Sequence, residues 1–433
     1  MQIQKGGAAV KRSLKDILVV GFALFSMLFG AGNVIFPPYL GLGCGPQWVE
    51  GFLFYYLADI GLALACLFAV QKGGGRQSIT GRLGPIPAEI LTCVIILCIG
   101  PMVAIPRTAA SVFEMSVTPL VPGVNSILFS IVFFAFIAAL CMKESAVVDI
   151  IGKILTPFLL IGLLILIIKG TLSPIGPVSN QVLVDNVPLT GINAGYQTMD
   201  VLAIVIFGIL ISKSVRDKGY ANLKQQNRII FGAGLVGGIT LFVMYLGLTY
   251  LGVTASSMFD LSVGRTFLVT TIVHELLGQS GTVIFAIVVA LACITTAVAL
   301  VSSCSDYFST LSKGRVKYSW LVVLICGFSA IVTPFGLDQI IAIAGPVLDI
   351  VYPPTLVLII MSFFDRWVKN DWAYRFAALG ACFVSVMTVL FKMGVAPFAF
   401  LDYLPLQTYG FGWIVPAIVC AVIGSFIPRK EKT

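Results

Sequence analysis

Long blocks of apolar residues recur along the chain and are separated by short polar breaks. Each block holds about 18–30 residues, the length that an α-helix needs to cross the hydrocarbon core of a bilayer. Twelve blocks are distinguished, at residues 17–42, 46–70, 84–112, 124–142, 145–169, 192–213, 227–252, 280–311, 318–335, 338–363, 372–394 and 408–427. Alternation with a period of two residues is weak, which argues against an outer-membrane barrel. The pattern predicts an all-α polytopic membrane protein with about 12 transmembrane helices.

The breaks between the blocks differ in charge. Lys and Arg precede the first block and follow the second, fourth, sixth, eighth, tenth and twelfth, whereas the odd-numbered breaks hold few, with Lys169 and Arg265 as exceptions. Because cytoplasmic loops are enriched in basic residues, this alternation predicts that both chain ends are cytoplasmic. Residues 1–16 and 428–433 are then cytoplasmic tails, and the first block is a retained span because no small-residue cleavage site follows it.

Composition agrees with a membrane location. Of the 433 residues, 58% are hydrophobic and 11% are charged, against roughly 25% charged residues in soluble domains. The formal net charge of +8 resides in short loops, where it reports orientation, so we expect the lipid bilayer and not nucleic acid as a partner. The ten cysteines lie mostly in apolar blocks without a C-x-x-C pair, and we interpret them as packing residues. We expect no cofactor.

The first block contains residues that suit an unbroken helix poorly. They are Gly30, Gly32, Asn33, Pro37 and Pro38. A broken helix at membrane depth is tolerated only where it faces protein or a wet cavity. Its second half would point free amides and partial positive charge into the membrane interior, which suits a small anion such as a carboxylate. The alternative is that the two glycines only let helices pack closely.

The sixth block predicts a second interruption. Asn193 and Gly195 open it, and Asp200 lies some way inside it, where an acid usually faces a cavity or a partner. Two broken spans, five spans apart, are typical of two inverted five-helix repeats with a binding site between them at the midplane. The repeats would be residues 17–169 and 192–363, followed by two additional helices at 372–427.

Other polar residues lie at membrane depth in the third and eighth blocks. Thr295 and Thr296 either bond back to their own helix or ligate a small hard cation such as Na+ through oxygen. Pro101 and Pro106 predict kinks in the third block. Arg107 follows them and needs a counter-charge, for which Glu114 and Asp200 are the candidates; a structural ion pair and a gating role both stay open.

Three further features stand apart from these blocks. Asp59 and Asp349 also lie in apolar blocks, and their roles are left open. Between the seventh and eighth blocks, the outer break predicts a short helical cap over residues 263–278. The single histidine, His274, is expected to be a loop residue.

Short motifs along the chain carry a resemblance to one family. They are Gly21-Phe-Ala-Leu-Phe, Phe29-Gly-Ala-Gly-Asn-Val-Ile-Phe-Pro-Pro38, Gly100-Pro-Met-Val-Ala-Ile-Pro-Arg-Thr-Ala109, Ile151-Gly-Lys-Ile-Leu-Thr-Pro157, Gly195-Tyr-Gln-Thr-Met-Asp200, Cys293-Ile-Thr-Thr-Ala-Val-Ala-Leu-Val-Ser302 and Tyr352-Pro-Pro354. In this order the chain resembles the branched-chain amino acid:cation symporter family, the BrnQ-like carriers of the amino-acid–polyamine–cation superfamily. The resemblance implies a LeuT-like fold, location in the cell membrane, and uptake of L-leucine, L-isoleucine and L-valine driven by a Na+ or H+ gradient.

The resemblance also implies site residues. A sodium site would lie between the first and eighth spans, with Ala292, Thr295 and Thr296 from the A-x-x-T-[ST] pattern and, by register, the carbonyls of Ser26 and Phe29. As a hypothesis, the substrate carboxylate binds the amides of Gly30, Ala31, Gly32 and Asn33. Its ammonium group then meets carbonyls near Tyr196, Gln197 and Thr198. Asp200 is a second cation ligand, a proton carrier or the partner of Arg107, so coupling or gating is assigned to Asp200, Arg107 and Glu114.

Three other functions compete with this interpretation. A channel would not need two broken helices in paired positions. A membrane enzyme would need a nucleophile and a base or a metal cluster, for which one histidine gives little. A LeuT-like carrier of another neutral amino acid is the nearest rival, and proton coupling is the alternative to sodium.

Overall fold

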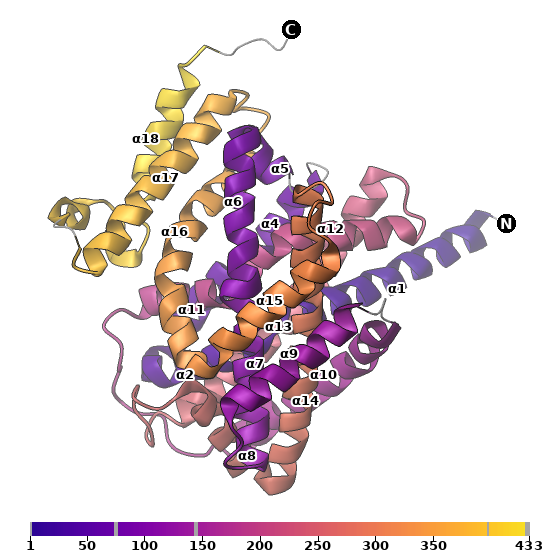
Figure 1. Ribbon diagram of the computed structural model, residues 1–433, viewed down its shortest axis with the longest axis vertical. Helices are drawn as coiled ribbons and strands as arrows, with labels where there is room; N and C mark the ends of the chain where they lie inside the picture. Colours follow the sequence, from indigo (N-terminus) through magenta and orange to yellow (C-terminus); the bar gives the residue numbers. More distant parts are fainter. Residues whose placement is uncertain (1, 73–76, 143–145, 396–397, 429–433) are drawn as a thin grey trace.

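The computed structural model describes residues 2–72, 77–142, 146–395 and 398–428, and within these ranges it contains helices and no strands (Figure 1). The α-helices are α1 (Gln2–Leu28), α2 (Ala31–Cys44), α3 (Trp48–Tyr56), α4 (Leu62–Lys72), α5 (Gln77–Thr80), α6 (Pro85–Leu97), α7 (Ala104–Val112), α8 (Thr118–Leu120), α9 (Ser126–Met142), α10 (Ala146–Leu172), α11 (Val187–Thr198), α12 (Asp200–Asp217), α13 (Leu223–Thr254), α14 (Arg265–Leu311), α15 (Tyr318–Val332), α16 (Leu337–Phe363), α17 (Asp371–Lys392) and α18 (Ile414–Ser425). Three π-helical segments interrupt them, η2 (Leu57–Gly61), η4 (Cys98–Met102) and η5 (Phe113–Val117).

Helices lie over all twelve apolar blocks, but their lengths vary. Among the described residues, seven helices are long and apolar enough to cross a membrane, and eight are if the bent pair Val187–Gly208 and Leu210–Asp217 forms one span. Three apolar helices are shorter. The all-helical membrane fold is therefore confirmed, whereas the exact number of twelve spans and the two repeats stay predictions. The predicted C-terminal tail lies outside the described residues except for Pro428.

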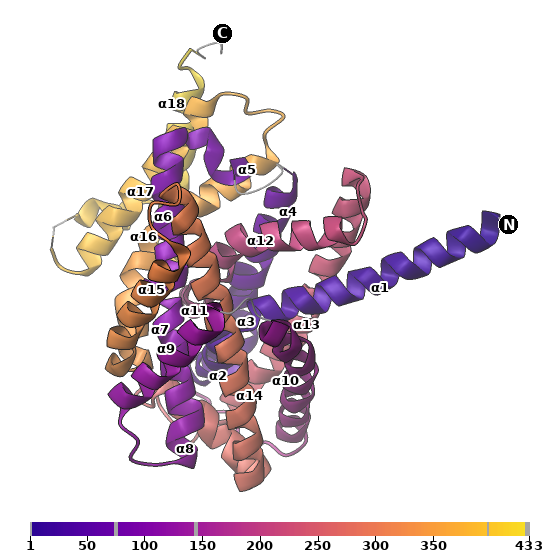
Figure 2. The same ribbon diagram turned by 45° about the vertical axis from the view of Figure 1, so that its right-hand side comes forward.

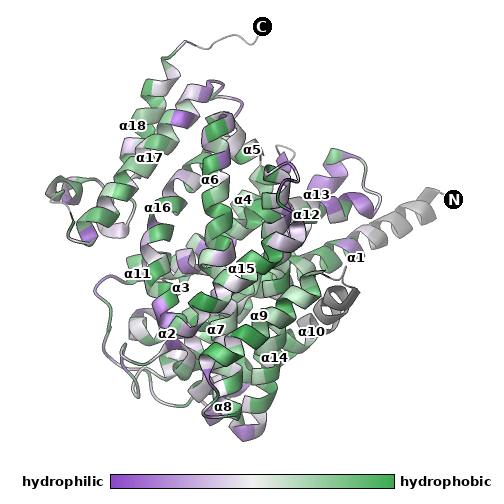
Figure 3. Cartoon of the chain, viewed as in Figure 1, coloured by the Kyte–Doolittle hydropathy of each residue, from purple (hydrophilic) through white to green (hydrophobic). Residues whose placement is uncertain are grey.

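Large apolar side chains face outward from the helical bundle. Leu128, Ile239 and Leu324 are each more than half exposed, at 61%, 63% and 66%. Figure 3 shows mostly hydrophobic residues along the helices, with hydrophilic residues mainly at helix ends and in loops. Such a surface is suited to lipid and not to water.

The first block is interrupted, but not at its prolines. Helix α1 ends at Leu28 and α2 begins at Ala31, with Gly30 in an extended conformation between them. Pro37 and Pro38 lie inside the continuous helix α2. The second half of α1 packs against α13, where a Cβ atom on Gly21 would lie 2.7 Å from Val236, and Figure 2 shows the N-terminal part of α1 projecting from the bundle. The residues predicted as an N-terminal tail are helical from Gln2 onward.

The sixth block is interrupted at Met199, later than the sequence suggests. Asn193 and Gly195 lie within α11, which ends at Thr198. Met199 adopts a left-handed conformation with φ of 67°, and α12 then begins at Asp200. The left-handed residue breaks the helical hydrogen-bond ladder, so the acid predicted inside the span stands at the first position of the second half-helix.

The kinks elsewhere follow the sequence in part. Gly100, beside Pro101, has non-helical angles in η4, so the kink predicted at Pro101 is confirmed. The kink predicted at Pro106 is wrong, because this residue lies in the first turn of α7, where proline is tolerated. Helix α14 bends at Gly278, and its part before this glycine is the helix predicted between the seventh and eighth blocks, whereas its role as a cap stays a prediction. His274 lies in that helix and not in a loop, so the expectation for it was wrong.

Helices α2 and α13 approach each other more closely than side chains allow. A Cβ atom built on Gly252 would lie 1.8 Å from the carbonyl oxygen of Pro38, and one built on Gly41 would lie 2.0 Å from that of Thr249. Glycine is therefore required at both positions. The two glycines at the break differ from each other. A Cβ atom on Gly30 would meet only ordinary contacts at 3.8 Å and beyond, whereas one on Gly32 would lie 3.0 Å from Nη2 of Arg107, so the close-packing alternative holds for Gly32 but not for Gly30.

We predict that Gly252→Ala destabilises the protein. The added methyl group would force α2 and α13 apart, and overpacking of this kind costs about 1–3 kcal/mol. The melting temperature of the purified protein in detergent should fall by several degrees. Gly327→Ala is the matched control, because Gly327 lies in α15 with nothing within 4 Å of a built Cβ. Equal melting temperatures for the two variants would contradict the contact.

Candidate functional site

The two helix breaks lie against a group of buried polar side chains. Its members are Asn33, Asp59, Arg107, Thr198 and Asp200, none of which is more than 5% exposed. We call these five residues the break cluster. They come from α2, η2, α7, α11 and α12, so the cluster joins both interrupted blocks to the second and third blocks. Buried polar groups at this depth must find partners within the protein.

Asn33 connects the two breaks directly. Its Nδ2 donates a hydrogen bond to Oδ2 of Asp200 at 2.8 Å and another to the hydroxyl group of Tyr245 in α13. Its Oδ1 accepts the amide of Gly30 at 3.4 Å. Asn33 thus holds the start of α2 while it binds the first residue of α12.

Arg107 caps the first half of the broken sixth block. Its guanidinium group donates to the carbonyl oxygens of Gln197 and, at 3.2 Å, of Thr198. The last carbonyls of a helix have no intrahelical partner and carry partial negative charge, so a cation is favourable there. These carbonyls, together with the nearby Asp200, offset the positive charge of Arg107, for which the sequence predicts a counter-charge.

Glu114 has other partners. Its carboxylate accepts the hydroxyl group of Thr266 at 2.7 Å and the amide of Leu337 at 2.8 Å, so it ties η5 to α14 and α16. Among the two candidate counter-charges for Arg107, only Asp200 lies in the break cluster.

Asp59 belongs to the site, although the sequence alone left its role open. Its Oδ1 accepts the hydroxyl group of Thr198 at 2.8 Å, and its carboxyl group lies within hydrogen-bond reach of that of Asp200. The Oδ2 atom is buried without a hydrogen-bond partner. Two carboxyl groups from different blocks therefore meet next to the break at Met199.

A small cavity opens between the breaks. Its volume is about 50 Å³, which holds a few water molecules but not an amino acid. The predicted site residues that line it are Gly30, Ala31, Asn33, Arg107, Thr198, Asp200 and Thr296. Apolar residues complete its wall, among them Ile99, Phe207 and Leu300. This cavity would have to widen to admit an amino acid.

Three predicted substrate residues lie beside this cavity without lining it. Gly32 faces Arg107, since a built Cβ would lie 3.0 Å from Nη2 of that residue. The carbonyl of Gln197 is bound by Arg107. The ring of Tyr196 stacks on that of Tyr352 with 4.3 Å between centroids and faces a different, outer groove.

The predicted cation residues are only partly assembled. The hydroxyl groups of Thr295 and Thr296 donate to the carbonyl oxygen of Ala292 at 2.8 and 3.0 Å, which is the back-bonding alternative. Thr296 also faces the break, because its Cγ2 lies 4.0 Å from a Cβ built on Gly30. Phe29 and Ser26 lie at the end of α1 on the other side of this break, and the amide of Phe29 donates to the carbonyl of Phe25 at 2.8 Å.

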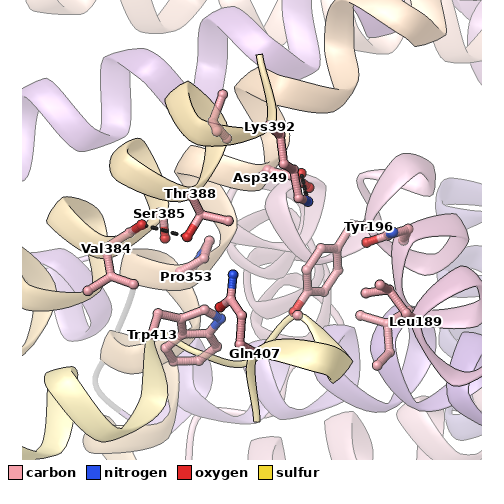
Figure 4. Close-up of a pocket in the computed structure, with 14 residues that line it drawn as sticks. Leu189, Tyr196, Asp349, Pro353, Val384, Ser385, Thr388, Lys392, Gln407 and Trp413 are labelled. Carbon is pink, nitrogen blue, oxygen red and sulfur yellow. Dashed lines mark hydrogen bonds and ion pairs between the residues drawn. The ribbon is translucent and has the colours of Figure 1, made fainter. Parts of the chain in front are cut away.

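Asp349, whose role the sequence left open, lies in the outer groove. The groove has a volume of about 70 Å³ and lies between α11, α16 and α17 (Figure 4). Asp349 forms an ion pair with Lys392 there, at 3.3 Å. Both side chains are partly exposed, so the pair contributes little energy.

Sequence reasoning missed the aromatic residues around the break cluster. Tyr55, Tyr245 and Tyr352 are fully buried, and only Tyr245 has a hydrogen bond through its hydroxyl group in the described residues. Tyr55 and Tyr245 lie in apolar blocks where nothing in the local pattern separates them from core aromatic residues, and Tyr352 entered the sequence analysis only as part of the Tyr352-Pro-Pro354 motif, without a role. Only an acid in the same turn, Asp59 after Tyr55, marks one of them.

Comparison with known proteins identifies close relatives. The profile of a family described as branched-chain amino acid transport protein matches residues 13–431. The branched-chain amino acid permease BraB of Bacillus subtilis is 34% identical over 432 residues, which cover 96% of each chain. The branched-chain amino acid permease BrnQ of Escherichia coli is 32% identical over 422 residues, which cover 94% of each chain.

Solved structures share the fold at low sequence identity. Mhp1 in an inward-facing conformation has a TM-score of 0.62 and 13% identity, and the match covers 94% of this chain and 90% of Mhp1. MhsT in complex with L-phenylalanine has a TM-score of 0.59 and 15% identity, with 93% and 97% covered. At such identities the likeness shows the fold alone, and it supports the LeuT-like fold class.

We predict that Arg107→Met lowers stability. The methionine keeps the unbranched first part of the side chain but leaves the carbonyls of Gln197 and Thr198 without donors, and a buried group without its partner costs about 1–3 kcal/mol. The melting temperature in detergent should fall by several degrees, whereas Arg228→Met, at an exposed position of α13, should leave it unchanged. A wild-type melting temperature for Arg107→Met would show that the cap is dispensable.

Proposed function

Because the chain belongs to the branched-chain amino acid transport protein family, we propose that it imports L-leucine, L-isoleucine and L-valine by symport with a cation, most simply Na+. Like its relatives, it is a multi-pass membrane transporter and not an enzyme. The observation that carries the proposal is the meeting of two interrupted helices at one buried polar cavity, in a chain whose permease relatives match it over nearly its whole length.

The carboxylate of the substrate would bind at the start of α2. The first amides of a helix have no intrahelical acceptor and carry partial positive charge. Here the free amides are those of Ala31 and Gly32, with Gly30 at the N-cap. The amide of Asn33 donates to the carbonyl oxygen of Gly30 at 3.2 Å and would have to exchange this bond for one to the substrate. The guanidinium group of Arg107 lies against Gly32 and adds a full positive charge on the same side.

The ammonium group would bind at the end of α11. The carbonyls of Gln197 and Thr198 already accept Arg107, but each carbonyl oxygen has a second lone pair. The carbonyl of Tyr196 accepts the amide of Met199 at 3.1 Å and likewise keeps one lone pair. Asp200, one residue beyond the break, supplies negative charge next to these groups.

An apolar side chain would then face Ile99, Phe207 and Leu300 in a widened cavity. A single methylene group in such a pocket contributes only about 1–3 kcal/mol of discrimination. The three branched-chain amino acids should therefore bind with overlapping affinity. A carrier for another neutral amino acid is the nearest alternative, and it would show a different order of competition.

Coupling would come from a cation held next to the carboxylate. The oxygens of Ser26, Phe29, Ala292, Thr295 and Thr296 form the proposed Na+ site, because a hydroxyl group that donates its hydrogen to Ala292 keeps lone pairs for a cation. Cation and substrate would strengthen each other's binding by about 1–3 kcal/mol. Proton coupling through an acid, Asp200 first, is the alternative. Glu114 would act only in gating, through its bonds to α14 and α16.

Alternating access would then follow from the topology. In this proposal residues 17–169 and 192–363 are inverted repeats that move around the fixed site. The protein lies in the cell membrane with both chain ends in the cytoplasm, and residues 372–427 add two helices outside the repeats.

We predict that Thr296→Ala abolishes sodium-driven uptake. Labelled leucine would be followed in proteoliposomes of the wild type under an inward Na+ gradient or an inward proton gradient, each imposed alone. Accumulation with Na+ alone, lost in Thr296→Ala, is the expected result. Thr240→Ala is the matched control, because this hydroxyl group makes the same back-bond to Val236, at 2.8 Å, without lining the cavity.

Other outcomes of this experiment would contradict parts of the proposal. Accumulation with protons alone would keep the transporter but reject the Na+ site. No concentrative leucine uptake under either gradient would reject leucine as the substrate while it leaves the fold unaffected.

A further inference from the structure

Three ionisable side chains are buried together in the break cluster, and their charges do not balance. Asp59, Asp200 and Arg107 are 0%, 5% and 5% exposed. Two carboxylates and one guanidinium group leave one negative charge uncompensated. In a region of low dielectric such a charge is strongly unfavourable, and the cluster therefore has a place for one monovalent cation.

The hydrogen bonds show where this charge lies. Arg107 directs its donors to the carbonyls of Gln197 and Thr198. Asp200 accepts Asn33 through Oδ2, and Asp59 accepts Thr198 through Oδ1.

The remaining oxygen of Asp59, Oδ2, is buried and accepts no hydrogen bond of normal geometry. The carboxyl group of Asp200 and the hydroxyl group of Tyr55 are the polar groups beside the Asp59 carboxyl group. A pair of adjacent carboxylates without a donor between them repels, whereas one proton between them turns the contact into a hydrogen bond.

The other titratable groups around the pair do not compete for this proton. They are Tyr55 of α3, Arg107 of α7, Tyr245 of α13, Cys293 of α14 and Tyr352 of α16. Phenols, thiols and guanidinium groups ordinarily lose their protons above neutral pH. The two carboxyl groups are thus the first members of the cluster to lose a proton as the pH rises.

We propose that Asp59 and Asp200 share one proton and form a proton site, distinct from the Ser26–Thr296 oxygens, whose occupancy strengthens the binding of the transported amino acid. The link to the substrate rests on the proposed function, whereas the proton site does not. The link to the substrate follows from the position of Asp200. This residue begins α12 and binds Asn33, which lies in the first turn of α2, where the substrate carboxylate is proposed to bind. Loss of the proton adds a negative charge there and repels the carboxylate.

The proton site is tested first without any substrate. Infrared difference spectra of the purified protein between acidic and alkaline buffer should show the band of a protonated carboxyl group that disappears at alkaline pH. Asp59→Asn should remove this band, because its amide replaces the protonated carboxyl group and still donates to Asp200. Asp349→Asn, which changes a partly exposed carboxylate in an ion pair, should leave it unchanged. A band retained in Asp59→Asn overturns the shared proton.

The linkage is then tested by leucine binding at several pH values in sodium-free buffer. In the wild type the affinity should weaken as the pH rises, by at most tenfold per pH unit because one proton is linked. Asp59→Asn should bind leucine with an affinity independent of pH, and Asp349→Asn should follow the wild type. An unchanged pH profile in Asp59→Asn overturns the linkage, as does an affinity that strengthens with pH.

Wild-type protein alone gives a second measurement if Asp59→Asn does not fold. Leucine added to the protein in weakly buffered solution with a pH-indicator dye should remove protons from the solution. If leucine binding takes up no proton, the linkage is overturned. If leucine binding instead takes up no proton and strictly requires Na+, the carboxyl pair is a sodium ligand set. If leucine does not bind at any pH, the proposed function fails, while the infrared result still decides the proton site.

Discussion

The structure depends on how free backbone groups are satisfied inside a membrane. Each interrupted helix exposes amides or carbonyls that hydrocarbon cannot bind. Arg107 takes the carbonyls at the end of α11, and Asn33 joins the start of α2 to the first residue of α12. These bonds come from side chains and can be exchanged for those of a bound molecule. A break that is held this way offers donors and acceptors at membrane depth, which is why we propose it as the substrate site.

The surrounding helices keep these breaks in place. Helix α2 is pressed against α13 at Gly41 and Gly252, where no side chain fits, so the half-helix cannot turn freely about its axis. The π-helical segment η2 brings Asp59 to Thr198 at the end of α11. Tight packing and exchangeable polar contacts thus lie in adjacent turns. The first fixes the direction of the helix ends, and the second leaves them able to respond to charge.

Sequence reasoning predicted the residue types at the site better than their partners. Gly30, Asn33 and Asp200 stood out because they are unfavourable in an apolar helix, and all three line the cavity. The break of the sixth block was misplaced because Asn193 and Gly195 are tolerated within a helix, whereas the left-handed residue is Met199. The partner of Arg107 was sought among acids, since carbonyls at a helix end carry no mark in the sequence. Tyr245 was missed because a buried tyrosine in an apolar run looks like core.

The central claim is that the bonds between the two breaks form the substrate site. Equilibrium binding of labelled leucine to purified Asn33→Ala tests it most directly, with melting temperature as the check on folding. Asn193→Ala is the matched control, since this asparagine lies on α11 and lines the outer groove instead. The account predicts that Asn33→Ala binds leucine at least about tenfold more weakly, a loss of about 1.4 kcal/mol, while Asn193→Ala binds as the wild type does. Wild-type affinity in a folded Asn33→Ala protein would contradict it.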